Sequence, residues 1–300
     1  MLKSKLLLAT GVCCAAWSAV PSASAITIRD DIGGSGSRAF ADSDDAFDSV
    51  VWVDGCTGVL IAPDVILTAR HCGIFNGDQV RFGTNVNNPD LIRTVTSVSN
   101  PDGFGSLLDG GDVTIARLSS PVPSSVATPL RIIDETVGLV GQVAATLGYG
   151  FNGVGSSGHG FTGDDRRWGG TNVIDRYGTA PGSSSSFTSN IFSTDFDNGS
   201  FFNNTISGSD PTPTEFEATT APGDSGGPIL VNIGDEWLVA GVLSGGTTFN
   251  SVYGDISWWT GVQPYRTQIE AFGGQFTLIP EPSGVLALAS AGLILARRRR

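Results

Sequence analysis

Lysine and histidine are scarce in this 300-residue chain, and its formal net charge is −12. No lysine follows Lys5, and the two histidines are His71 and His159. An excess of negative charge disfavours contact with nucleic acid and with anionic membrane surfaces. The composition therefore argues against both as partners of the folded protein.

Cysteine is also rare, with four residues in the chain. Cys13 and Cys14 fall in an N-terminal segment interpreted below as a signal peptide, which leaves Cys56 and Cys72. The C-x-x-C spacing of cysteine metal sites is absent, and no metal or cofactor site is predicted. In an oxidising compartment, Cys56 and Cys72 are expected to form a disulfide.

Helical periodicity is nearly missing, apart from a weak pattern over 263–272. Short runs rich in Val, Ile and Leu are separated by Gly, Pro, Asp and Asn, which is typical of an all-β sandwich or of β-barrels. Residues 26–48 are expected to be irregular, and 150–209 to form loops with strands at 170–175 and 190–196. The main predicted strands cover 49–53, 58–61, 65–68, 112–118, 142–147, 227–231, 236–243 and 251–257.

The first 25 residues have the layout of a secretory signal peptide. Two lysines precede an apolar run over 6–20, and the segment closes on Ala23-Ser24-Ala25, a pattern that signal peptidase accepts. A membrane anchor is the alternative, but the apolar run is short and ends in proline and small residues. The mature chain is therefore expected to begin at Ile26.

Residues 279–300 also have a layout in three parts. Pro280-Glu281-Pro282 is followed by an apolar stretch over 284–296 and by four arginines. This layout resembles the PEP-CTERM sorting signal of Gram-negative bacteria. The resemblance implies export to the cell envelope or beyond, transient anchoring in the inner membrane through this tail alone, and processing by a sorting transpeptidase. A last core helix is the alternative, and the terminal arginines argue against it.

One histidine stands directly after a predicted strand. In Leu67-Thr68-Ala69-Arg70-His71-Cys72, His71 neighbours a cysteine that a disulfide could tie back to Cys56. A general base must be aimed rigidly, because small displacements are costly in rate. The disulfide would supply that rigidity and makes His71 a candidate base, although a lone histidine is more often structural.

The segment Pro222-Gly223-Asp224-Ser225-Gly226-Gly227-Pro228 is far more specific. A serine becomes a nucleophile when a neighbouring base takes its proton, and backbone N–H groups must face the oxyanion that forms. Glycines let the backbone turn and approach a substrate closely. Ser225 is the candidate nucleophile, and the N–H groups of Gly223 and Ser225 are the expected oxyanion donors.

Together these segments resemble the trypsin/chymotrypsin family of serine endopeptidases. The run 56–72 resembles the two strands before the family's histidine, 112–118 its aspartate-bearing strand, and 242–246 the strand that binds the substrate backbone. The resemblance extends from about Val51 to Phe272 and is poor between 150 and 209.

The resemblance implies two six-stranded antiparallel β-barrels with the active site in the cleft between them. The first would cover 26–135, including the leading segment, and the second 136–278. His71, Asp112 and Ser225 would form a catalytic triad acting on a protein or peptide substrate. Asp112 would hold the imidazole of His71, which in turn would take the proton of Ser225.

Two further sites follow from the resemblance. The base of the primary substrate pocket would be Thr219, with Ser244, Gly246 and Ser251 also binding substrate. Because Thr219 is not an acid, the substrate residue bound there is expected to be neutral rather than basic. Asp224 would form a buried salt bridge with a newly freed amine of Ile26, and an internal partner for Asp224 is the alternative.

Two other classes of protein share parts of this pattern. Residues 223–227 also satisfy the G-x-S-x-G pattern of α/β-hydrolases, but that fold needs its histidine after the serine, and both histidines precede it. His159, in a Gly- and Ser-rich loop, is expected to be a bystander. A catalytically inactive binding module at the cell surface is the second alternative, although such relatives usually lose a triad residue.

Overall fold

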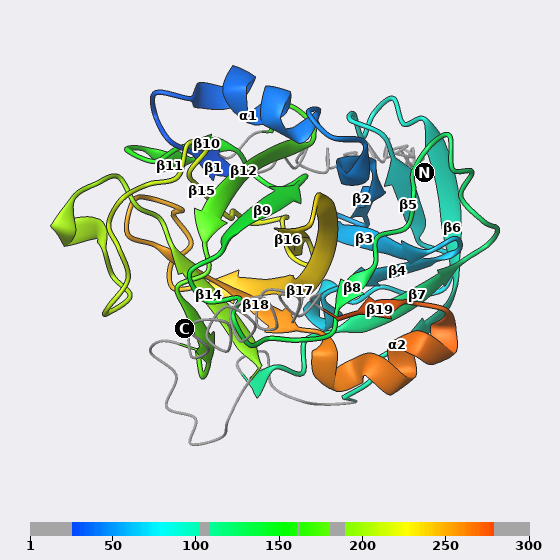
Figure 1. Ribbon diagram of the computed structural model, residues 1–300. Helices are drawn as coiled ribbons and strands as arrows, with labels where there is room; N and C mark the ends of the chain where they lie inside the picture. The colour runs from blue at the N-terminus through cyan, green and yellow to red at the C-terminus, as the bar shows by residue number, and fades with distance from the viewer. Residues whose placement is uncertain (1–25, 103–108, 161–162, 181–189, 279–300) are drawn as a thin grey trace, which may run out of the picture.

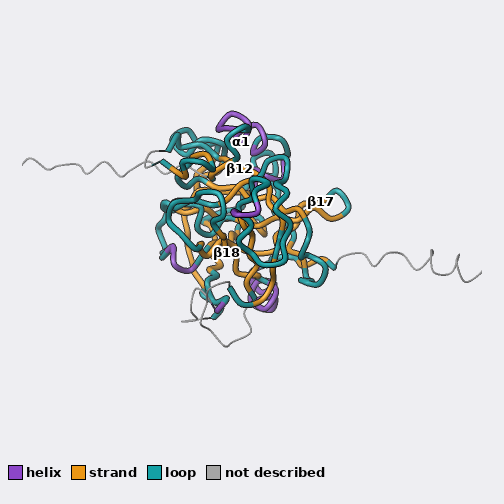
Figure 2. The backbone as a smooth tube through the Cα atoms, turned by 90° about the vertical axis from the view of Figure 1, so that its left-hand side faces the viewer, coloured by secondary structure: helices purple, strands orange, loops and turns teal. Residues whose placement is uncertain are grey.

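The computed structural model describes residues 26–102, 109–160, 163–180 and 190–278. The predicted signal peptide and the sorting tail lie outside the described residues. In the described part of the chain, no helix combines the length and apolar character needed to cross a membrane. Strands form the interior of the molecule, and loops and short helices surround them (Figure 2).

The N-terminal half forms a closed antiparallel barrel, on the right of Figure 1. Its centre contains side chains from the N-terminal half alone, among them Leu60, Ile66 and Phe82. Leu60 faces this interior while its neighbours Val59 and Ile61 belong to a different cluster, so the strand is buried on both faces. Double burial explains its continuous apolar run. In barrel order the strands are β2 (Val50–Val53), β3 (Cys56–Ala62), β4 (Val65–Thr68), β7 (Thr114–Leu118), β6 (Leu91–Ser99) and β5 (Gln79–Phe82).

The C-terminal half forms a curled nine-stranded sheet. Seven strands follow one another across it, and β8 (Ile132–Ile133) and β19 (Phe276–Thr277) join beside β17. The closed barrel and this curled half-barrel confirm the all-β, two-barrel fold. Across the sheet the order is β12 (Trp168–Val173), β9 (Val143–Gly148), β16 (Pro228–Ile233), β17 (Glu236–Gly246), β18 (Ile256–Gly261), β14 (Ile191–Asp195) and β13 (Arg176–Gly178).

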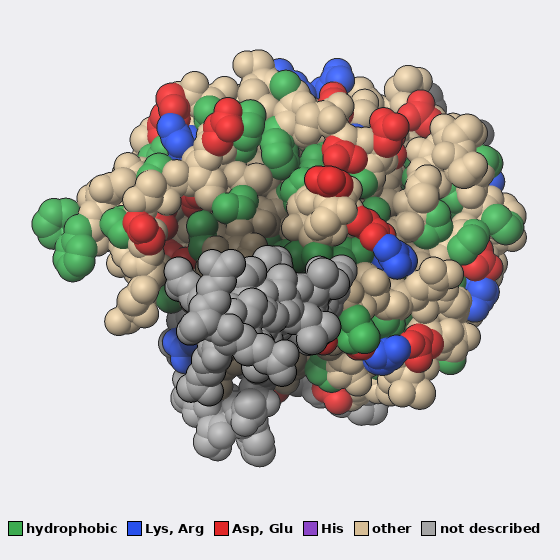
Figure 3. Space-filling view, in the orientation of Figure 1, with side chains coloured by type: hydrophobic (Ala, Val, Ile, Leu, Met, Phe, Trp, Pro, Cys, Tyr) green, Lys and Arg blue, Asp and Glu red, His purple; other side chains and the backbone are tan. Residues whose placement is uncertain are grey.

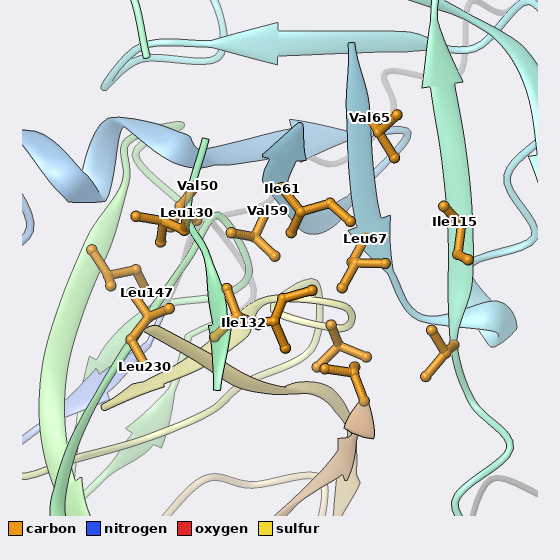
Figure 4. Close-up of a cluster of buried hydrophobic side chains, with 14 of the residues drawn as sticks. Val50, Val59, Ile61, Val65, Leu67, Ile115, Leu130, Ile132, Leu147 and Leu230 are labelled. Atoms are coloured by element: carbon orange, nitrogen blue, oxygen red, sulfur yellow. The ribbon is translucent and has the colours of Figure 1, made fainter. Parts of the chain in front are cut away.

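A shared core joins the two halves (Figure 4). Val59 and Leu67 from the barrel face Leu147 and Leu230 from the curled sheet, and Ile132 lies between them. All five side chains are fully buried. Each such burial stabilises the fold by about 1.5–3 kcal/mol, so the two halves are fixed as one unit.

The leading segment, 26–48, was expected to be irregular, and this expectation was wrong. The segment contains β1 (Thr27–Ile28), α1 (Gly33–Ala41) and the start of the 3₁₀ helix η1 (Asp45–Ser49). β1 pairs with β10 (Gly153–Val154) and with β15 (Ala218–Thr219), while α1 packs on β12. A Cβ at Gly34 would lie 2.4 Å from the Trp168 ring, so glycine permits this close approach. Tertiary contact, rather than helix propensity, therefore forms α1.

Most other predicted elements are confirmed, including the C-terminal helical segment as η5 (Gln263–Tyr265) and α2 (Arg266–Phe272). The prediction of a strand over 251–257 was wrong for its first five residues, because β18 begins at Ile256. Ser251 has φ +56°, which ends an extended run. β5 and β6 were missed, because β6 is only half-buried and mixes polar with apolar residues. The remaining short elements are β11 (Gly158–His159), η2 (Arg70–Cys72) and η4 (Phe201–Asn203).

Candidate active site

Two adjacent strands of the barrel bring a histidine and an aspartate together. His71 lies in η2, directly after β4, and Asp112 lies just before β7, which pairs with β4. His71 Nδ1 is 2.7 Å from Asp112 Oδ2, and the His71 backbone N–H donates to Asp112 Oδ1 at 2.9 Å. Asp112 is fully buried, so these two bonds fix both the carboxylate and the ring.

The second half of the molecule places a serine against the same ring. Ser225 Oγ lies 2.7 Å from His71 Nε2, on the side away from Asp112. The Ser225 carbonyl accepts from the Thr57 backbone N–H of β3 at 2.8 Å, which ties the serine loop to the barrel. Gly226 in this loop has φ +78°, and a Cβ there would lie 2.1 Å from Thr68 Oγ1. Only glycine fits this junction.

A disulfide joins Cys56 to Cys72, as predicted. It connects the start of β3 to the residue after His71. The histidine is thereby anchored on one side by the covalent link and on the other by Asp112. Such anchoring holds the ring in one orientation toward Ser225.

The loop before Ser225 turns back on itself. Gly223 has φ +97°, and a Cβ there would lie 2.6 Å from Gly150 Cα. Among the residues that the structure describes, no acceptor bonds the backbone N–H of Gly223 or of Ser225. These two N–H groups are therefore able to donate to a ligand oxygen.

Asp224 anchors this loop from behind. Its carboxylate is buried and accepts three backbone N–H groups: Ile26 at 3.0 Å, Ala221 at 2.8 Å and Gly150 at 2.9 Å. Burial raises the pKa of Asp224 to about 7, and the three hydrogen bonds act against that shift. Asp224 thus contacts both candidate partners, the Ile26 nitrogen and the internal backbone.

The comparison with protein families agrees with this geometry. The sequence profile of the family described as Trypsin matches residues 36–269, which is most of the chain. The protein belongs to the trypsin family. It is accordingly a trypsin-like serine peptidase, and its substrates are peptides or proteins. No protein of curated function matches it in a sequence comparison.

The trypsin-family domain has a pocket of about 490 Å³ beside His71 and Ser225. The four residues predicted to bind substrate, Thr219, Ser244, Gly246 and Ser251, all line it. Thr219 is buried, and its hydroxyl lies 3.0 Å from that of Ser257. The pocket surface at Thr219 is therefore polar and uncharged.

One acid on the pocket wall was missed by the sequence analysis. Asp255 lines the pocket, and its Oδ2 accepts from the Val252 backbone N–H at 3.0 Å and from the Thr248 hydroxyl. The pocket predicted from the resemblance consists of Thr219, Ser244, Gly246 and Ser251, and Asp255 is not among them. Asp255 is the sole aspartate in the predicted strand 251–257, and its position there was the available signal.

Elsewhere in the described residues, no group of three His, Cys, Asp or Glu side chains is placed to hold a metal ion. His159 lies in β11 and takes no part in the Asp112–His71–Ser225 array.

Proposed function

We propose that the protein is a serine endopeptidase in which Ser225 is the nucleophile, His71 the general base and Asp112 the residue that orients it. The observation that carries this proposal is the unbroken hydrogen-bonded array, with 2.7 Å at each of its two side-chain links. A serine hydroxyl aligned on an imidazole, itself held by a buried carboxylate, is the arrangement that acyl transfer requires. An inactive binding module would usually lack one of these three residues, and here all three are present.

In the proposed reaction, Ser225 Oγ attacks the substrate carbonyl carbon while His71 Nε2 takes its proton. The oxyanion that forms accepts from the Gly223 and Ser225 N–H groups. The C–N bond then breaks, His71 returns the proton to the leaving amine, and an ester on Ser225 remains. Water activated by His71 hydrolyses that ester by the same steps. The negative charge of Asp112 stabilises the imidazolium in both halves of the reaction.

The proposed primary specificity is for a neutral residue. Thr219 offers no charge at the base of the pocket, and the Asp255 carboxylate already accepts two hydrogen bonds from its own loop. A substrate cation would have to compete with those donors for Asp255. We expect matched peptides to be cleaved after Leu in preference to Arg. A strong preference for Arg that Asp255→Asn removes would instead make Asp255 the counter-charge.

The proposed activation step is the release of the Ile26 amine. Ile26 is buried with φ +60°, a strained value for a β-branched residue within a chain. An N-terminal residue has no preceding carbonyl, so cleavage after Ala25 would remove this strain. It would also convert the bond to Asp224 into a buried ion pair that holds Gly223 and Ser225. The competing possibility is that Gly150 and Ala221 alone satisfy Asp224.

The proposed setting is the envelope or exterior of a Gram-negative bacterium. It rests on the signal-peptide pattern of residues 1–25 and on the likeness of 279–300 to a PEP-CTERM signal. A sorting transpeptidase acting on the tail would then be a partner in processing. The disulfide is consistent with an oxidising compartment.

The proposed function can be tested by labelling. A fluorophosphonate probe reacts only with an activated serine. We expect the purified mature protein to be labelled at Ser225 and Ser225→Ala to remain unlabelled. A folded wild-type protein that neither reacts with the probe nor cleaves a peptide library would favour the inactive binding module.

A further inference from the structure

One face of β14 and of the residues that follow it carries buried oxygen atoms without a hydrogen-bond partner among the described residues. These atoms are Ser193 Oγ, Asp195 Oδ1 and Asp197 Oδ1. Ser193 and Asp195 are fully buried, and Asp197 is 5% exposed. The backbone stays extended beyond Asp195, because the Phe196 N–H donates to the Asp255 carbonyl at 3.0 Å. Alternate residues of an extended strand share a face, so the three side chains lie in a row.

Asp197 is the most isolated side chain of this row. Its backbone N–H donates to Glu217 Oε1 at 3.4 Å, but its carboxylate oxygens form no hydrogen bond or ion pair with any described residue. Burial, followed by the charges of Asp195 and Asp210, raises the pKa of Asp197 to about 7. An ionised carboxylate buried without a partner is costly, so this position requires a positive charge or a proton.

Two further carboxyl groups lie beside the row. Asp175 Oδ2 accepts from the Asp195 backbone N–H at 3.1 Å, and burial together with the charge of Asp195 raises the pKa of Asp175. Glu217 is buried as well, and its Oε2 accepts from the Thr214 N–H at 2.8 Å. Negative charge is therefore concentrated in a part of the protein from which water is largely excluded.

No cation among the described residues forms an ion pair with these four acids. Arg176 pairs with Ser193 across β13 and β14, but its side chain is exposed. The charge of Glu217 reaches Arg29, whose guanidinium is already bonded to Asp31. The positive charge that the row requires therefore has no source in the described residues.

The chemistry of the available ligands favours calcium. All of them are oxygen atoms, whereas zinc sites usually contain nitrogen or sulfur. No three acidic side chains in the described ranges are placed to hold a metal ion together, so a site here must combine two carboxylates with neutral oxygens. Ca²⁺ accepts such mixed sets, with about six to eight ligands in flexible geometry, while Mg²⁺ demands a near-ideal octahedron. The expectation of no metal site rested on cysteine spacing, which has no bearing on oxygen ligands.

We propose that Asp195 and Asp197, with the Ser193 hydroxyl, form a calcium site beside β14 that backbone carbonyl groups and water complete. The bound ion supplies the charge that the two carboxylates lack. It also fixes the loop that follows β14, because the second oxygen of Asp195, Oδ2, accepts from the Ile206 N–H at 2.9 Å and from the Thr205 hydroxyl at 3.2 Å. This inference is independent of the proposed peptidase function.

Calcium binding can be measured without catalysis. The mature protein is treated with EDTA, freed of the chelator and titrated with CaCl₂ at pH 8 by calorimetry. We expect one saturable site with a Kd of roughly 10⁻⁴–10⁻³ M, as in extracellular calcium modules. At 10 mM CaCl₂ the thermal midpoint should rise by roughly 3–10 °C, because the ion binds the folded state alone. The same concentration of MgCl₂ should produce a much smaller rise.

Asp197→Asn keeps the size of the side chain and removes its charge. Without calcium, its thermal midpoint should equal or exceed that of the wild type, because an unpartnered buried carboxylate is gone. Its Kd for calcium should be weakened roughly tenfold or more, and its thermal midpoint should no longer respond to the ion. The matched control is Asp235→Asn, in the exposed turn between β16 and β17, where φ is +67° and asparagine is tolerated. This control should bind calcium like the wild type.

A wild-type protein that shows no saturable binding of calcium up to 10 mM would overturn the proposal, and protons or water would then satisfy these oxygens. Calcium binding that Asp197→Asn leaves unchanged would also overturn it, because the ion would then lie elsewhere on the acidic surface. If Asp197→Asn does not fold, Ser193→Ala replaces it, since this change removes an unpartnered hydroxyl and should weaken calcium binding without lowering the thermal midpoint in EDTA. Neither negative result bears on the assignment of Ser225.

Discussion

At the scale of single residues, the array of Asp112, His71 and Ser225 makes the sharpest prediction. Ser225→Ala and His71→Ala should each lower kcat by orders of magnitude, because these residues act as a unit. Asp112→Asn should lower it by roughly 10⁴-fold, since an amide nitrogen cannot accept from His71 Nδ1–H and the ring takes the wrong tautomer. Hydrolysis of a peptide substrate measures the loss, and unchanged thermal midpoints show that the fold is intact. Undiminished hydrolysis by Ser225→Ala would show that Ser225 is not the nucleophile.

At the scale of elements, β1 carries the activation hypothesis, because it places Ile26 against Asp224 between β10 and β15. One extra residue ahead of Ile26 would have to enter a buried site and would move the amine away from the carboxylate. We expect such an extended protein to hydrolyse a small ester far more slowly than the form that begins at Ile26. The matched control is Ile26→Val, which keeps the amine and should retain most activity. Full activity in the extended form would mean that Gly150 and Ala221 are the partners that matter for Asp224.

At the scale of the whole molecule, an acidic protein that buries several carboxylates should lose stability as the pH rises. Acidic side chains are spread over the face in Figure 3, yet Glu217 is inside. Burial raises its pKa from 4.5 to about 8, against hydrogen bonds from Thr214 and Asp197. The folded state therefore holds a proton that the unfolded state releases, so this contribution is complete below pH 4.5 and lost as the pH rises through 8.

Urea unfolding from pH 4 to 9 measures this loss, with each unit of pKa shift worth about 1.4 kcal/mol. Glu217→Gln should flatten the decline, because glutamine needs no proton to remain neutral. Glu215→Gln, two residues away and exposed, should leave it unchanged. A wild-type stability that is flat between pH 5 and 8 would contradict the expected cost of ionising Glu217.

The strands with apolar runs, the disulfide and the segment around Ser225 were all predictable from the sequence. Each depends on a short stretch of sequence. β3 is apolar on both faces, and Gly223 and Gly226 beside Ser225 adopt positive φ angles that favour glycine. The order of the candidate residues along the chain, His71 before Asp112 before Ser225, indicated the family together with the segments around them.

The remaining features depend on contacts between residues that are far apart in the sequence, so no local pattern predicts them. Helix α1 has a Gly- and Ser-rich sequence of low helix propensity, and it forms where Trp168 and β12 cover it. Asp255 became part of the substrate pocket only when the 247–252 loop folded over it. His159, an unremarkable loop residue in the sequence, gained its two carbonyl partners from the same folding. Local patterns fix which chemistry is possible, and long-range packing fixes which side chains meet to perform it.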